Sequence, residues 1–179
     1  TTATLKGEEY VITGEKAYVP FAKNAEAMIV YAALDGVTQG FIVGKGAAGL
    51  TVAEEAEKMM GLNALPTYRV KLDGVKVPLA NRLGDASGHD FEPILASMRV
   101  ANAAAAVGVA NAAFEYAKIY AKEREAFGVK IAQKQAIAFM LAEMRTEIEA
   151  SRLLTWEAAW KLDQGKEDAF TEAYLAATG

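Results

Sequence analysis

The chain has 179 residues, of which 53% are hydrophobic, and a formal net charge of −4. This charge argues against a protein that binds nucleic acid through a basic surface. The chain has no cysteine, which excludes disulfides, thiol nucleophiles and thiolate metal sites; with His89 as its one histidine, we expect neither a histidine metal site nor a Ser–His triad.

The size allows one or two domains with a buried core. No secretory signal is visible. The most apolar run, residues 100–113, contains Asn102 and Asn111 and is too short to cross a bilayer, so no membrane span is predicted. Because the chain starts at Thr1 rather than at a methionine, we expect it to be an excised piece of a longer protein.

Residues 1 to about 80 have the pattern of short strands. The predicted strands comprise residues 9–13, 16–19, 28–34, 41–43, 67–72 and 75–77. Gly14 predicts a hairpin between the first two, and Asp73-Gly74 predicts a turn between the last two. Residues 44–49 contain three glycines, but no G-K-[ST] follows, so we expect a loop rather than a phosphate-binding loop. Closely spaced strands of this kind favour an antiparallel sheet or barrel.

The period then changes to that of long helices. Residues 81–90 are polar and predict a linker, in which His89 is interpreted as a surface or capping residue. Residues 91–122 predict one helix that is apolar nearly all round and therefore buried on most sides. A second helix is expected from residue 133 to about 163, and a third over 168–177.

The turn between the first two helices carries the most specific signal. It contains Arg124, Phe127 and Gly128, which we place at a helix start. An arginine can bind a pyrophosphate through two hydrogen bonds, and a helix N-terminus adds free N–H groups and a favourable dipole. The pattern therefore indicates an anionic, ring-bearing ligand. From the residues alone, an ion pair of Arg124 with Glu123 or Glu125 is the alternative.

The segments R-E-A-F-G, L-A-E-M-R and S-R-L-L-T-W-E-A-A-W, with Gln135 between the first two, resemble the acyl-CoA dehydrogenases. G-E-K-A-Y-V-P and V-P-L-A-N-R-L-G extend the resemblance over essentially the whole chain. It implies an α+β fold, with a partial middle β-domain at 1–84 and a partial C-terminal helical domain at 88–179. The second domain would be an incomplete four-helix bundle, and the family's N-terminal helical domain would be missing.

The resemblance also implies residue roles. Arg124, Phe127 and Gln135 would contact the adenine-dinucleotide part of FAD, from a neighbouring subunit. Tyr18, Val19 and Pro20 match the strand that packs on the flavin ring, although core packing is the alternative for these three residues. Pro20 departs from the family pattern because it has neither a hydroxyl nor the backbone N–H that can support flavin N5.

Arg99 matches an arginine near the acyl-binding cavity, with a structural ion pair as the alternative. Met98 occupies the position at which some members carry the catalytic glutamate. We therefore assign no catalytic base within the chain and expect it beyond Gly179. We interpret the helix carboxylates Glu143, Glu147 and Glu149 as a solvated face or as partners in ion pairs.

The function implied by the resemblance is α,β-desaturation of an acyl-CoA thioester, with α-proton abstraction and transfer of the β-hydride to flavin N5. An electron-transfer flavoprotein would accept the electrons, and a homodimer or homotetramer is expected. The expected location is the cytoplasm, or the mitochondrial matrix in a eukaryote. Two alternatives stay open: an acyl-CoA oxidase-like or flavin monooxygenase-like relative, and a non-catalytic oligomerisation or binding module.

Overall fold

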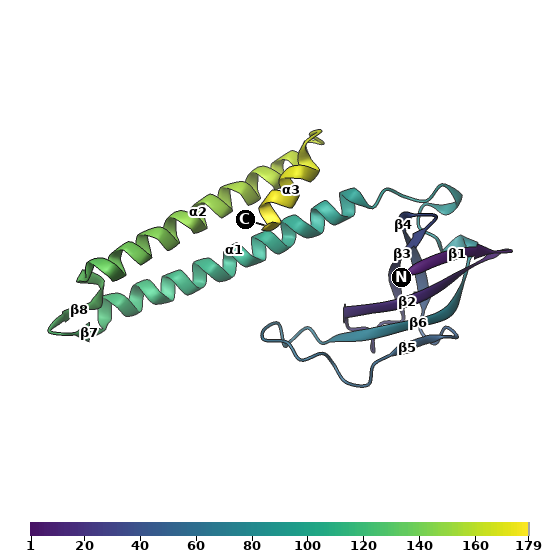
Figure 1. The fold of residues 1–179 in the computed structure, drawn as a ribbon, viewed down its shortest axis with the longest axis horizontal. Helices are drawn as coiled ribbons and strands as arrows, with labels where there is room; N and C mark the ends of the chain where they lie inside the picture. The colour runs from purple at the N-terminus through teal and green to yellow at the C-terminus, as the bar shows by residue number, and fades with distance from the viewer. Residues whose placement is uncertain (179) are drawn as a thin grey trace. The chain divides into compact units, whose positions relative to one another are not determined.

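The computed structural model describes residues 1–178, which divide into two compact units. The first unit, Thr1–Phe91, is a sheet, and the second begins at Glu92 and is helical (Figure 1). This confirms the predicted α+β class, with strands followed by long helices. The domain limits 1–84 and 88–179 stay a prediction.

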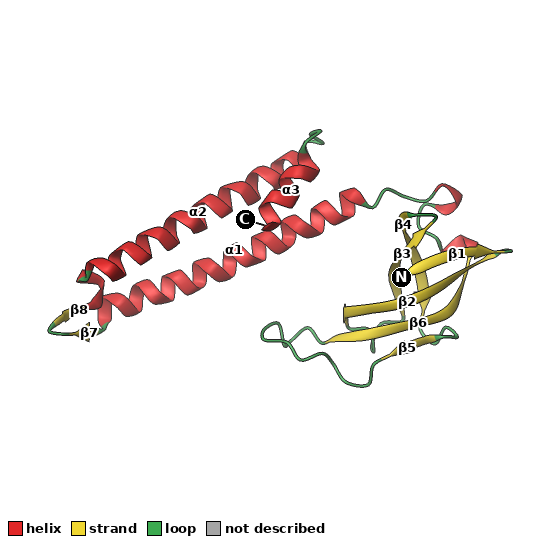
Figure 2. Ribbon diagram, in the orientation of Figure 1, coloured by secondary structure: helices red, strands yellow, loops and turns green. Residues whose placement is uncertain are grey.

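Figure 2 shows the six strands of the first unit, whose order across the sheet is β4-β3-β1-β2-β6-β5. Their bounds are β1 Thr2–Lys6, β2 Glu9–Pro20, β3 Ala27–Leu34, β4 Val37–Gly44, β5 Leu50–Val52 and β6 Thr67–Pro78. All neighbours pair antiparallel except β1 and β3, which are parallel. The core lies on one face and contains Phe41, Ile12 and Val75, each fully buried.

The hairpin predicted at Gly14 and the turn predicted at Asp73-Gly74 are both wrong, because β2 and β6 each run through the glycine without a break. Their pairing shifts register there: Ile12 faces Val75, whereas Gly14 faces Leu72. Extra residues in one strand of a ladder make a β-bulge, which bends the strand rather than reversing it. Gly14 has φ 144°, and a Cβ there would lie 2.6 Å from Thr1 Cα.

The segment after β6 is bound to the sheet. The Arg82 guanidinium donates to Gln39 Oε1 at 3.0 Å, and the His89 backbone N–H donates to the same oxygen at 3.2 Å. Both ring nitrogens of His89 are buried without a hydrogen-bond partner among residues 1–178. The interpretation of His89 as a surface or capping residue is therefore wrong, since its ring packs beside Tyr31 at a centroid distance of 6.1 Å.

The second unit contains three helices within the described residues: α1 Glu92–Glu123, α2 Gln135–Asp163 and α3 Ala169–Thr178. The expectation that the first helix is buried on most sides is not met within this chain. Its buried residues are Ala96, Ala103, Phe114 and Ala121, whereas Val109 is 72% exposed. Among the described residues α1 alone is long and apolar enough to cross a membrane, judged by length and composition only.

α1 and α2 lie side by side and antiparallel, as Figure 1 shows. Ile148 of α2 is 7% exposed, whereas Met144, one turn earlier, is 43% exposed. Asn111 of α1 accepts hydrogen bonds across the pair from Arg145 at 3.4 Å and from Arg152 at 3.2 Å. Polar as well as apolar contacts therefore hold the two helices together.

Lys161 joins α2 to α3. Its Nζ lies 2.7 Å from Asp168 Oδ2, 2.9 Å from Glu172 Oε1 and 3.1 Å from Glu157 Oε1. Hydrogen bonds to Asp168 and then Glu172 raise the pKa of Lys161 above its ordinary 10.5. The hydrogen bond from Lys161 lowers the pKa of Asp168 below its ordinary 3.8. One lysine thus compensates three carboxylates at the end of the α2–α3 pair.

Lys161→Met should destabilise the helical unit most near neutral pH. A lowered carboxyl pKa stabilises the fold above 3.8 and loses that contribution as pH falls through the lowered value. A raised lysine pKa stabilises it below 10.5 and loses that contribution as pH rises through the raised value. The gap in urea midpoint between wild type and Lys161→Met, followed by helical circular dichroism, should therefore be widest from about pH 5 to 9. Lys122→Met, at an exposed helix position, is the control. A gap that is constant down to about pH 2 would contradict the assignment.

Candidate functional site

The turn between α1 and α2, residues 124–134, is a compact hairpin rather than an open loop. β7 (Glu125–Ala126) pairs with β8 (Val129–Lys130), and Phe127 and Gly128 form its tip with φ 57° and 79°. A two-residue hairpin of this type requires positive φ at both positions, which glycine tolerates and phenylalanine adopts at a cost. The ring of Phe127 is 95% exposed at the tip.

Backbone hydrogen bonds fix where Arg124 lies. Its N–H donates to Tyr120 O at 2.8 Å, and its carbonyl accepts from Ile131 N at 2.9 Å. Arg124 therefore directly follows the C-terminal end of α1, and our placement of it at a helix start is wrong. The next helix, α2, starts at Gln135. The hairpin and the 3₁₀ turn Ile131–Gln133 lie between Arg124 and this helix start.

Arg124 forms an ion pair with neither Glu123 nor Glu125 in the structure, so the ion-pair alternative is wrong. Lys130 Nζ lies 2.7 Å from Glu125 Oε1 and donates to Glu123 O at 3.0 Å. Within residues 1–178 the Arg124 guanidinium has neither an ion-pair partner nor a hydrogen-bond acceptor, and the residue is exposed. An exposed arginine whose neighbouring carboxylate is taken by a lysine is available to an external anion.

The start of α2 adds to the positive character of the hairpin. Lys134 is the N-cap residue of α2, but its side chain makes no capping hydrogen bond. The first turn of α2 has no acidic residue. Lys134 Nζ lies 4.8 Å from the Phe127 ring centroid, a cation–π distance. The first N–H groups of a helix lack partners within the helix, so this end attracts anions. Cations and an exposed ring thus occur together in the turn that contains Arg124 and Phe127 and that leads directly into Gln135, the first residue of α2.

Tyr18, Val19 and Pro20 form the end of β2 in the sheet unit. Val19 pairs with Tyr68 and Pro20 with Thr67, but Lys16 pairs with Val70, so Ala17 and Tyr18 together face one residue, Arg69. We call these two residues the Tyr18 bulge. Tyr18 has φ 55° and is 58% exposed, and Pro20 is exposed as well. Core packing, the alternative for this segment, therefore does not describe Tyr18 or Pro20.

Glu57 is the residue of this region that the sequence reasoning missed. Its Oε2 accepts from the Tyr18 backbone N–H at 2.7 Å, and its Oε1 lies 3.1 Å from Arg69 Nε. The Glu57 side chain is only 14% exposed. No spacing signal links residue 57 to residue 18, so only the folded sheet makes this contact visible.

Arg99 is half-buried on α1, and its guanidinium lies 5.3 Å from the Tyr174 ring of α3. This cation–π contact is the partner that a charge on an apolar helix needs. Of the predicted acidic residues, Glu149 pairs with Arg145 and lies 3.6 Å from Arg152 Nε. Among the described residues, no group of three or more His, Asp or Glu side chains is placed to hold a metal ion.

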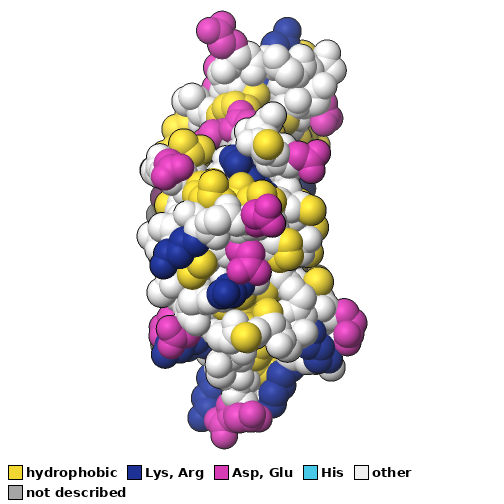
Figure 3. All heavy atoms as spheres, turned by 90° about the vertical axis from the view of Figure 1, so that its right-hand side faces the viewer, with side chains coloured by type: hydrophobic (Ala, Val, Ile, Leu, Met, Phe, Trp, Pro, Cys, Tyr) yellow, Lys and Arg dark blue, Asp and Glu magenta, His cyan; other side chains and the backbone are white. Residues whose placement is uncertain are grey.

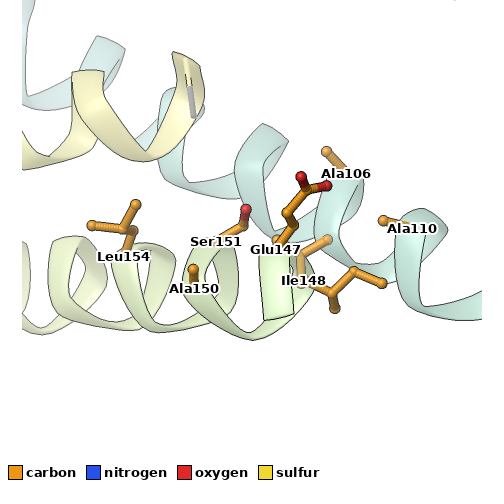
Figure 4. A pocket seen from close by; sticks show the side chains of 8 residues that line it. Ala106, Ala110, Glu147, Ile148, Ala150, Ser151 and Leu154 are labelled. Atoms are coloured by element: carbon orange, nitrogen blue, oxygen red, sulfur yellow. The ribbon is translucent and has the colours of Figure 1, made fainter. Parts of the chain in front are cut away.

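An open groove of about 610 Å³ lies between α1 and α2. Figure 4 shows its lining, in which Glu147 and Ser151 are the polar side chains among apolar ones. On the face of the molecule in Figure 3, Lys and Arg side chains are interspersed with Asp, Glu and hydrophobic side chains.

Comparison with known proteins covers nearly the whole chain. Residues 1–75 match the family model described as acyl-CoA dehydrogenase, middle domain, and residues 91–178 match acyl-CoA dehydrogenase, C-terminal domain.

Among curated relatives, the chain is 41% identical to benzylmalonyl-CoA dehydrogenase of Aromatoleum aromaticum, over 98% of this chain and 48% of the relative. It is 36% identical to a caffeyl-CoA reductase–Etf complex subunit of Acetobacterium woodii, again over 98% and 48%. The structure of butyryl-CoA dehydrogenase from Megasphaera elsdenii matches with TM-score 0.81 and 33% identity, over 98% of this chain and 48% of that one. The chain therefore spans about half the length of the curated relatives it matches.

The apolar residues left exposed on the helices predict self-association. Leu153, Trp156 and Trp160 line one stripe of α2 and are 59%, 62% and 54% exposed. Apolar patches of this kind mark association sites. We expect a dimer or larger assembly in sedimentation at micromolar concentration, and Leu153→Glu with Trp156→Glu should shift it toward monomer. Gln164→Glu, which adds a single negative charge at an exposed polar position, should not. A wild-type chain that sediments as a monomer would contradict the prediction.

Proposed function

The chain belongs to the acyl-CoA dehydrogenase family, and from this premise we propose that the protein containing it is an FAD-dependent acyl-CoA dehydrogenase. The family is generally flavin-dependent. When bound, FAD would accept the β-hydride of the acyl-CoA thioester while a carboxylate base removes the α-proton. The product is the α,β-unsaturated thioester. The chain itself contributes binding and orientation to this chemistry.

The observation that carries the proposal is the arrangement in the interhelix turn. The Arg124 guanidinium has no partner among the described residues, and Lys130 forms an ion pair with the neighbouring carboxylate of Glu125. A guanidinium can hold a pyrophosphate through two charge-assisted hydrogen bonds, and the N–H groups at the start of α2 suit the same anion. We assign Arg124 and Gln135 to the dinucleotide, and we assign the exposed ring of Phe127 to its apolar contacts.

The end of β2 suits the isoalloxazine ring. Tyr18 presents an exposed aromatic side chain, while Val19 and Pro20 continue the strand in register with β6. Aromatic side chains offer large rigid contact areas to planar ligands. Pro20 has no backbone N–H to donate. Any hydrogen bond to the reactive nitrogen of the flavin would therefore come from another residue.

We assign the acyl-CoA to a site near Arg99. We propose none of the described carboxylates as the base: Glu149 is paired with arginines, and Glu147 lines an open groove. The base is therefore proposed to lie outside residues 1–178. Electrons would pass to an electron-transfer flavoprotein, a partner supported by the relative named as a subunit of an Etf complex. A homodimer or homotetramer in the cytoplasm, or in the mitochondrial matrix of a eukaryote, completes the proposal.

One observation favours a second candidate function. Because Pro20 offers no N–H beside the flavin, the reduced cofactor would be less restrained there, and reaction with oxygen as in an oxidase or monooxygenase becomes the competing chemistry. Stopped-flow mixing of the reduced flavoprotein with oxygenated buffer separates the two. Slow reoxidation supports the dehydrogenase, and fast reoxidation supports the oxygen-reactive enzyme.

Arg124→Ala should weaken FAD retention by the full-length protein by about 2–4 kcal/mol, roughly 30-fold to 1000-fold, because a bidentate contact to phosphate is lost. Arg124→Lys should recover only part, since it keeps the charge without the planar fork. FAD content is read from absorbance after gel filtration at low protein concentration. Lys122→Ala removes an exposed cation two residues away and should bind FAD like the wild type. Equal occupancy in all four proteins would remove Arg124 from the site.

A further inference from the structure

The Tyr18 bulge is a strained element that needs an explanation. Two residues of β2, Ala17 and Tyr18, face the single residue Arg69 of β6. Tyr18 has φ 55°, and Phe21, three residues on, has φ 51°. Neither residue is a glycine, and residues other than glycine rarely adopt a positive φ. Strained backbone of this kind concentrates at functional sites, where the surrounding structure holds it in place.

What holds the bulge is a single carboxylate from another segment. A bulge leaves the N–H of its extra residue without a partner in the ladder. Glu57 Oε2 accepts this N–H from Tyr18 at 2.7 Å, and Glu57 Oε1 lies 3.1 Å from Nε of Arg69, the residue opposite. The side chain bridges both sides of the bulge.

Glu57 is itself held in place. Its backbone N–H donates to Thr67 O at 2.8 Å, so the backbone at Glu57 lies beside the start of β6. Its side chain is 14% exposed, whereas Arg69 is 67% exposed and Glu54, three residues earlier, is 92% exposed. A shielded carboxylate that accepts two hydrogen bonds at a strained residue differs from an ordinary surface ion pair, which contributes little.

We propose that Glu57 is a positioning residue that fixes the backbone at Tyr18, so that the exposed Tyr18 ring is oriented toward the flavin before the flavin binds. This rests on the proposed function, which places Tyr18 against the isoalloxazine ring. Glu57 does not touch the reacting atoms. It acts through the Tyr18 N–H, and preorganising that contact spares the cofactor the cost of ordering the strand.

The first test needs no flavin. The chain has seven tyrosines, so a ¹⁵N-tyrosine-labelled sample gives seven backbone amide signals, one of them Tyr18. Glu57→Ala should accelerate hydrogen exchange of the Tyr18 amide by roughly 10-fold to 100-fold, the value of a hydrogen bond to a charged group. The other six amides should keep their rates. Unchanged exchange at Tyr18 overturns the proposal.

Three further variants separate the causes. Arg69→Met removes the ion pair but leaves the Tyr18 bond, so the Tyr18 amide should exchange within about threefold of wild type. Glu54→Gln removes an exposed carboxylate that lies 3.0 Å from Lys23, and should have no effect. If Glu57→Ala accelerates exchange at every tyrosine amide, Glu57→Leu decides, because leucine keeps much of the side-chain bulk but offers no acceptor for the Tyr18 N–H. Faster exchange at Tyr18 alone supports the proposal, and unchanged exchange at Tyr18 overturns it.

The second test uses the full-length protein reconstituted with FAD. Glu57→Ala should shift the visible absorbance bands and the reduction potential of the bound flavin, while Arg124→Ala should lower FAD affinity and leave the bands of the remaining bound flavin unchanged. If Tyr18 loosens but the spectrum and potential of the flavin stay the same, Glu57 has only a structural role and the proposal fails. Failure of Arg124→Ala to affect FAD would instead count against the proposed cofactor site, while the Tyr18 exchange result stands by itself.

Discussion

The long antiparallel pairing of β2 with β6 is the constraint on which the sheet unit depends. Side chains alternate between the two faces of a strand, so any extra residue moves everything after it to the other face. The bulge opposite Thr13 lets both Leu72 and Val75 reach the core although three positions separate them. At the other end of the ladder the Tyr18 bulge shifts the register back by one residue, and the Tyr18 ring is left exposed to solvent. The same ladder thus makes the core and the surface that we assign to the cofactor.

The helical unit depends on a comparable device, the hairpin between α1 and α2. The bond from Ile131 N to Arg124 O closes the turn and returns the chain antiparallel to α1. Lys130 compensates the acidic residue beside Arg124, so the arginine is left for an external anion. In both units backbone hydrogen bonds hold the segment proposed to bind the cofactor, and Tyr18, Arg124 and Phe127 are left exposed there.

The helices leave apolar surface exposed in this chain. α1 buries only part of its apolar face in this chain, although its composition is that of a core helix. An exposed apolar surface of this kind marks a site at which other protein packs. The chemistry of Arg99, which lies against Tyr174, and of the groove beside Glu147 therefore depends on the protein that packs over these helices.

The sequence by itself determined the class of the fold, the ends of the long helices and the identity of the family. Helical periodicity and the punctuation at Gln164-Gly165 are local signals, and the R-E-A-F-G segment is specific. It did not determine the course of β2 and β6, because a glycine that permits a turn also permits a bulge, and only the partner strand decides between them. The contact of Glu57 with Tyr18 joins residues 39 apart in the chain. No periodic pattern encodes such a contact, so the bridging carboxylate emerged only when the tertiary structure brought the two segments together.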